Sequence, residues 1–137
     1  MIKVSTDDIE FTDDYTYLWN GQPFSGIGIE LDEVGTLVSE TEFQDGMQHG
    51  TTRSYYPSGR VKREAQFENN TLHGFLRDWA EDGLLEREEE YERGVCIRRK
   101  LRDQAGELSL CYELNENDPQ FEILQLLRKA ISTRPPA

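Results

Sequence analysis

Long hydrophobic runs, basic charge and cysteine are all scarce in this chain of 137 residues. Apolar stretches extend over two or three residues, far short of the ~20 that a membrane-spanning helix needs. Fifteen Lys and Arg oppose 27 Asp and Glu, and the formal charge of −12 argues against binding to nucleic acid or anionic lipid, whose phosphates would be repelled. The two cysteines, Cys96 and Cys111, form no Cys-x-x-Cys pair, and no signal-peptide-like segment opens the chain. We therefore expect a cytoplasmic protein with free thiols.

Glycine, aromatic and turn residues recur at a fixed step of 24 positions. The step is shared by four columns: Gly26, Gly50 and Gly74; Gly35, Gly59 and Gly83; Phe43, Phe67 and Tyr91; Gly46, Asn70 and Gly94. Gly106 follows Gly83 one residue early, so the fourth unit is shorter. Several independent columns at one period indicate an internal structural repeat.

Each unit contains two turn signals. In Pro57-Ser58-Gly59, proline sets φ for a turn and glycine tolerates positive φ. The second signal, Asn69-Asn70, consists of residues that enter the left-handed region at low cost. A unit is therefore expected to run strand, turn, strand, turn. We predict a mainly β fold over residues 17–114, an antiparallel meander of about four 24-residue hairpin repeats in a single elongated, twisted sheet.

The two ends of the chain differ from the repeats. Residues 1–16 form an acidic lead or an edge strand. Asp118 and Pro119 are typical of the N-cap and the first position of a helix, which predicts a helix over residues 118–132. Because a repeat sheet exposes its last edge, we expect this helix to cap it, packed on the apolar face or over the last strands. Residues 133–137 are predicted to be a flexible tail.

Alternation of side chains along the predicted strands indicates one apolar and one acidic face. The apolar parity contains Leu31, Leu37, Phe43, Tyr55, Val61, Phe67, Trp79, Leu85 and Tyr91. The opposite parity contains Glu30, Glu40, Glu42, Glu64, Asp78, Glu88 and Glu90. Four arginines share the apolar parity, where we expect their stems to lie over aromatic rings: Arg53, Arg63, Arg77 and Arg87.

The repeat unit is similar to a known pattern. The segments that carry the similarity are Tyr55-Tyr56-Pro57-Ser58-Gly59-Arg60-Val61-Lys62-Arg63-Glu64 and Phe67-Glu68-Asn69-Asn70-Thr71-Leu72-His73-Gly74. They resemble the variant MORN repeat. With the step Gly21-Gln22-Pro23-Phe24-Ser25-Gly26, residues 15–114 resemble the YwqK-like antitoxin family. This resemblance implies an immunity protein that binds and blocks a bacterial toxin, and it brings no catalytic residues.

No constellation for catalysis, metal or cofactor emerges. His49 and His73 hold equivalent places in consecutive units, two strands or about 9.5 Å apart, which is far for two ligands of one ion. Carboxylates such as Glu64 and Glu88 recur as a ladder without a distinguished acid and base pair. We expect no enzyme, no metal and no cofactor.

The acidic face is the candidate binding surface. One interpretation is the solvated side of a one-layer sheet, kept charged for solubility. The other is a surface for the basic cleft of a toxin domain, steered by charge and anchored by aromatic rings. The candidate residues are Glu40, Glu42, Glu64, Glu88, Glu90 and Asp78, with Tyr55, Tyr56 and Trp79. The predicted function is toxin neutralisation by stoichiometric binding, as a monomer or weak homodimer. The alternative is a repeat scaffold that joins other proteins.

Overall fold

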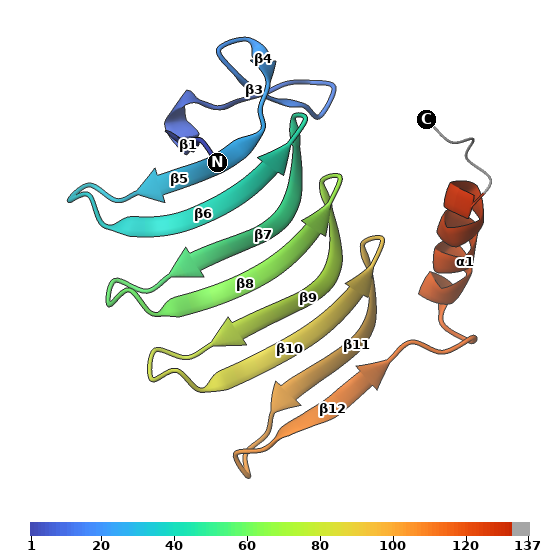
Figure 1. Ribbon diagram of the computed structural model, residues 1–137. Coiled ribbons are helices and arrows are strands. Elements are labelled where there is room, and N and C mark those ends of the chain that lie inside the picture. Colours follow the sequence, from blue (N-terminus) through green and yellow to red (C-terminus); the bar gives the residue numbers. More distant parts are fainter. Residues whose placement is uncertain (133–137) are drawn as a thin grey trace.

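The computed structural model describes residues 1–132, which form a long open sheet, a small second sheet and a C-terminal helix (Figure 1). The elements are β1 (Lys3–Ser5), the 3₁₀ turn η1 (Thr6–Asp8), β2 (Glu10–Phe11), β3 (Tyr17–Trp19), β4 (Gln22–Pro23), β5 (Gly26–Leu31), β6 (Leu37–Gln44), β7 (Met47–Tyr55), β8 (Val61–Glu68), β9 (Thr71–Trp79), β10 (Leu85–Glu92), β11 (Val95–Arg102), β12 (Leu108–Glu113) and α1 (Pro119–Ser132). The nine-stranded sheet has the order β1-β5-β6-β7-β8-β9-β10-β11-β12. The predicted meander with a C-terminal helix is confirmed; the tail predicted over 133–137 lies outside the described residues.

Two-residue turns join the hairpins along one side of the sheet. In each turn both residues have positive φ, for example 50° at Asn69 and 69° at Asn70, as a type I′ turn requires. The amide of Asn70 donates to the carbonyl of Gln48 at 2.9 Å, and the amide of Gly94 donates to the carbonyl of Leu72 at 2.8 Å. Each turn is therefore tied to the preceding repeat, which stacks the hairpins in register.

The glycines that begin each unit have a second role. Gly50 and Gly74 lie at β-bulges with φ of 108° and 109°. A Cβ at Gly74 would collide with the side chain of Gln66, whose Oε1 accepts the amide of Phe75 at 2.8 Å. The repeated glycine therefore makes room for a side chain that satisfies the backbone of the bulge.

The cross-strand register overturns the expected division into an apolar and an acidic face. Tyr55 lies opposite Val61, as the parity predicts. Lys62 of β8 is then an extra residue in a bulge, so Arg53 lies opposite Glu64. Arg77 likewise lies opposite both Glu64 and Glu88. Directly opposite residues of an antiparallel pair point to the same side. The extra bulge residue shifts the alternation by one, so Arg53 and Arg77 share a face with Glu64 and Glu88, whereas Arg63 and Arg87 lie on the other face.

Buried apolar side chains form two clusters at the N-terminal end and along the sheet. Phe24 and Phe43, 2% and 6% exposed, pack with ring centroids 5.5 Å apart. Ala65 and Leu76 are opposite one another and buried on the face that turns away from Glu64 and Glu88. The core is thin because a one-layer sheet can bury only a row of side chains.

Helix α1 lies beside the last strands (Figure 1). Leu124, 1% exposed, is its buried anchor. Arg128 forms a bidentate ion pair with Glu92 of β10, with Nε–Oε2 and Nη2–Oε1 distances of 2.6 and 2.7 Å. The hydroxyl of Tyr112 on β12 donates to Asp118 at 3.0 Å. Of the two expected positions for the helix, these contacts favour the one over the last strands.

Candidate protein-binding surface

A row of alternating charges crosses the middle of the sheet, with one residue from each of the strands β6 to β11. In spatial order the charge row is Glu40, Arg53, Glu64, Arg77, Glu88 and Lys100. Arg53 Nε lies 2.8 Å from Glu64 Oε2, and Arg77 Nε lies 2.8 Å from Glu88 Oε2. The hydrogen bond to Glu64 raises the pKa of Arg53 above its usual value. The face that carries this row, the charge-row face, therefore presents both signs of charge.

Most of the predicted binding residues share the charge-row face. Glu42 and Glu90 lie in the neighbouring row, opposite Ile27 and Phe75 respectively. The hydroxyl of Tyr55 donates to Glu40 at 3.3 Å. Trp79 holds the place equivalent to Tyr55 in the next unit. The surface thus combines two aromatic side chains with a border of charged ones.

Asp78 and Tyr56 lie elsewhere. Asp78 lies opposite Arg63 on the other face and accepts two hydrogen bonds from its guanidinium, at 2.6 and 2.9 Å. The Tyr56 hydroxyl donates to the carbonyl of Trp79 at 2.6 Å. Together Asp78, Tyr56 and Lys62 line a depression of about 560 Å³. The predicted set of nine is therefore split between the two faces.

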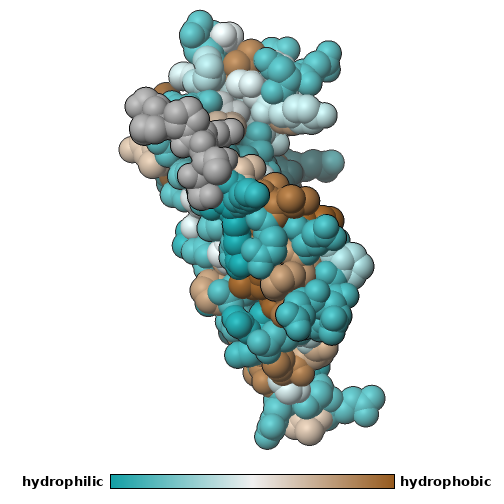
Figure 2. Space-filling view, turned by 90° about the vertical axis from the view of Figure 1, so that its right-hand side faces the viewer, coloured by the Kyte–Doolittle hydropathy of each residue, from teal (hydrophilic) through white to brown (hydrophobic). Residues whose placement is uncertain are grey.

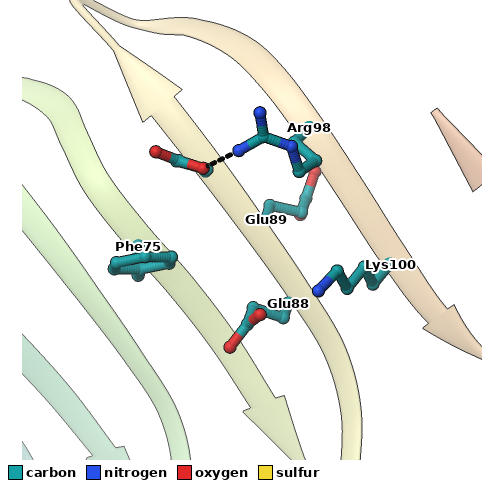
Figure 3. Close-up of a pocket in the computed structure, with 6 residues that line it drawn as sticks. Phe75, Glu88, Glu89, Arg98 and Lys100 are labelled. Atoms are coloured by element: carbon teal, nitrogen blue, oxygen red, sulfur yellow. Dashed lines mark hydrogen bonds and ion pairs between the residues drawn. The ribbon is translucent and has the colours of Figure 1, made fainter. Parts of the chain in front are cut away.

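A pocket of about 240 Å³ opens at the end of the charge row and is lined by Phe75, Glu88, Glu89, Glu90, Arg98 and Lys100 (Figure 3). In the two earlier units, the side chain at the place of Glu90 accepts a hydrogen bond from a backbone amide of the bulge. Glu42 accepts the amide of Thr51, and Gln66 accepts the amide of Phe75. The fourth unit has one residue fewer in this bulge, and Arg98 pairs with Glu90 instead. In the shorter unit an ion pair in the lining of the pocket therefore takes the place of the backbone contact of the earlier units.

Glu89 is a buried charge that the sequence analysis missed. It is 2% exposed, and its carboxylate accepts hydrogen bonds from Arg99 Nε at 2.8 Å and from the Tyr91 hydroxyl at 3.1 Å. Burial, followed by the charge of Glu89, raises the pKa values of Tyr91 and Cys96 above their usual values. Deprotonation of the Cys96 thiol is therefore disfavoured. One feature of the sequence could have indicated this burial: Glu89 holds the place that Ala65 holds in the preceding unit.

His73 supports a turn of the next unit. His73 Nδ1 accepts the amide of Arg93 at 3.1 Å, and its Nε2 lies 3.5 Å from Glu68. His49 and His73 line one open depression of about 330 Å³. Within residues 1–132, no group of three or more His, Cys, Asp or Glu side chains is arranged to hold a metal ion. In the same part of the chain, no helix is long and apolar enough to cross a membrane.

The fold and this surface define a β-repeat protein with an open, one-layer sheet. No family model matches the chain. It is 49% identical over 110 residues to the immunity protein YwqK of Bacillus subtilis (strain 168), an alignment that spans 80% of this chain and 71% of the relative. The chain therefore belongs to the YwqK family of immunity proteins.

Proposed function

We propose that this protein is an immunity protein that neutralises a protein toxin by stoichiometric binding, without catalysis. The observation that carries the proposal is the 49% identity to an immunity protein over 80% of the chain. The repeated sheet supports it, because a one-layer sheet offers a broad outer surface for a partner. We also propose that each 24-residue unit is a variant MORN repeat.

The proposed contact surface lies on the sheet and uses the residues singled out from the sequence. Tyr55 and Trp79 act as anchors, since aromatic side chains dominate binding energy in protein interfaces. Glu64 and Glu88 are held in ion pairs with Arg53 and Arg77, so they act as an oriented polar rim. The same face contributes Glu40, Glu42 and Glu90, and Asp78 and Tyr56 form a separate part of the proposed contact on the other side of the sheet. The proposed partner is a basic toxin domain, since the protein carries a formal charge of −12.

The test is neutralisation of a defined toxin. The toxin gene that lies next to the gene for this protein is expressed with and without this chain, and growth is measured. We expect growth to recover, and the purified proteins to form a complex of fixed stoichiometry by light scattering. Recovery without a complex would point to an indirect effect. A soluble, folded chain that neither restores growth nor binds the toxin contradicts the proposal.

A further inference from the structure

Exposed aromatic rings form a patch at the N-terminal end of the molecule. Tyr15 and Phe11 are 72% and 52% exposed, and their ring centroids lie 6.1 Å apart. Phe11 also packs on Tyr17 at 4.5 Å, and Tyr17 packs on the buried Phe43 at 4.9 Å. A continuous series of ring contacts therefore joins the core to the surface, so that the exposed rings have a rigid support.

The backbone also fixes the position of Tyr15. Its φ of 62° is unusual for a bulky residue. The amide of Tyr15 donates to the carbonyl of Thr12 at 3.1 Å, and the side-chain amide of Asn70 donates to the carbonyl of Tyr15 at 3.0 Å. The second bond links the N-terminal elements to the turn of a repeat 55 residues further along the chain. An anchor that is already ordered loses little entropy when a partner binds.

The net charge of the protein is concentrated around this end. Residues 1–52 contain eleven Asp and Glu and a single Lys, whereas residues 53–137 contain sixteen Asp and Glu and fourteen Lys and Arg. The ion pairs in which both partners are described residues lie between Arg53 and Arg128. Five exposed carboxylates flank the aromatic patch along the chain: Asp7, Asp8, Glu10, Asp13 and Asp14. Figure 2 shows mostly hydrophilic residues at the upper end of the molecule, where the N-terminal elements lie.

We propose that Phe11 and Tyr15, with the five flanking carboxylates, form a docking surface for a Lys- and Arg-rich segment of the toxin. The acidic surroundings select the occupant, because they attract a basic segment and repel a second copy of this acidic chain. Guanidinium groups stack on aromatic faces, and exposed rings beside carboxylates offer both contacts at once. The inference rests on the proposed function and adds to the contact surface on the sheet a second one, outside the long sheet, for the basic segment of the same partner.

The first experiment measures binding of the neighbouring toxin to variants of the full chain. Tyr15→Ala removes the most exposed ring, and Asp8→Asn with Asp13→Asn removes two carboxylates whose side chains form no hydrogen bond or ion pair among the described residues. We expect each variant to bind at least about tenfold more weakly. The charge variant should lose most of its difference from wild type in high salt.

Matched controls remove equivalent groups from the other end of the molecule. Leu126→Ala removes an apolar side chain that is 62% exposed on α1, and Glu107→Gln with Glu116→Gln removes two exposed carboxylates. Both controls should bind within about twofold of wild type. Wild-type affinity in folded Tyr15→Ala and in the Asp8 and Asp13 double variant would overturn the inference and leave the proposed function standing.

A second experiment does not depend on the toxin. A decaarginine peptide is titrated into the isotopically labelled wild-type protein, and backbone amide shifts are followed by NMR. We expect the largest shifts over residues 7–17, and their loss in the Asp8 and Asp13 double variant. Shifts that are spread evenly, or centred on the repeats, would overturn the inference. If the wild-type chain fails to bind the toxin, the proposed function fails, and the peptide result alone decides whether this surface takes a basic segment.

Discussion

Substituting a glycine in an open turn and a glycine in a bulge tests whether the bulge glycine makes room for the Gln66 side chain. Gly59 and Gly74 both have φ in the left-handed region, 91° and 109°. Alanine in that region costs about 1–2 kcal/mol. At Gly59 nothing lies within 4 Å of the added methyl group, so Gly59→Ala should cost this amount alone. At Gly74 the methyl group displaces the Gln66 side chain, and the hydrogen bond to the amide of Phe75, worth about 1 kcal/mol, is lost as well.

We therefore expect Gly74→Ala to destabilise the protein by about 2–3 kcal/mol, roughly 1 kcal/mol more than Gly59→Ala. The free energies of unfolding are measured by urea denaturation followed by circular dichroism. Adding Gln66→Ala supplies a double-mutant cycle, in which the cost of Gly74→Ala should fall to that of Gly59→Ala. Equal costs for the two glycine variants, or no coupling between Gly74 and Gln66, would refute the reasoning.

Three further predictions concern charge and binding. Glu89→Ala should lower the free energy of unfolding by about 1–3 kcal/mol, because Arg99 and Tyr91 lose a buried acceptor. Urea denaturation measures this change, and an unchanged stability would contradict a stabilising role for the hydrogen bonds of Glu89. Arg128 lowers the pKa of Glu92 below its usual value of 4.5, so this pair stabilises the fold above that pH and its contribution is lost as pH falls through the lowered pKa. The unfolding free energy of Glu92→Gln should accordingly depend less on pH below about 4.5 than that of wild type. Trp79→Ala should weaken toxin binding by about 2 kcal/mol in titration calorimetry, and unchanged affinity in a folded variant would remove Trp79 from the proposed surface.

The repeat could be predicted because its signals are local. Pro57-Ser58-Gly59 and Asn69-Asn70 each specify a turn through the φ values that these residues tolerate, and both turns form as expected. The same holds for Asp118 and Pro119, which precede and begin helix α1. Signals of this kind need no knowledge of what lies across the sheet.

The composition of each face could not be predicted in the same way. Arg53 and Tyr55 share a face of β7, as their parity predicts, whereas in β8 the parity fails between Val61 and Glu64. The bulge in β8, opposite Ser54 and Tyr55, shifts the pairing by one residue, so Glu64 lies opposite Arg53. A bulge of one residue cannot be recognised from alternation along the sequence, because it shifts the pairing between strands and leaves the order of the residues as it was.

The N-terminal elements provide the other example. Their acidity was evident from the sequence, but the contact between Asn70 and the backbone of Tyr15 spans 55 residues and depends on the stacking of the hairpins. The series of rings from Phe43 to Tyr15 likewise requires β6 and the small sheet to meet. Neither contact has a signal in local residue order.

The amino-acid sequence by itself determined the number and direction of the hairpins, since turn conformation follows from the residues in the turn. Only the tertiary structure decided which charges meet and which remain uncompensated. That outcome depends on the register between strands, and register is set by backbone hydrogen bonds and bulges that act across the sheet.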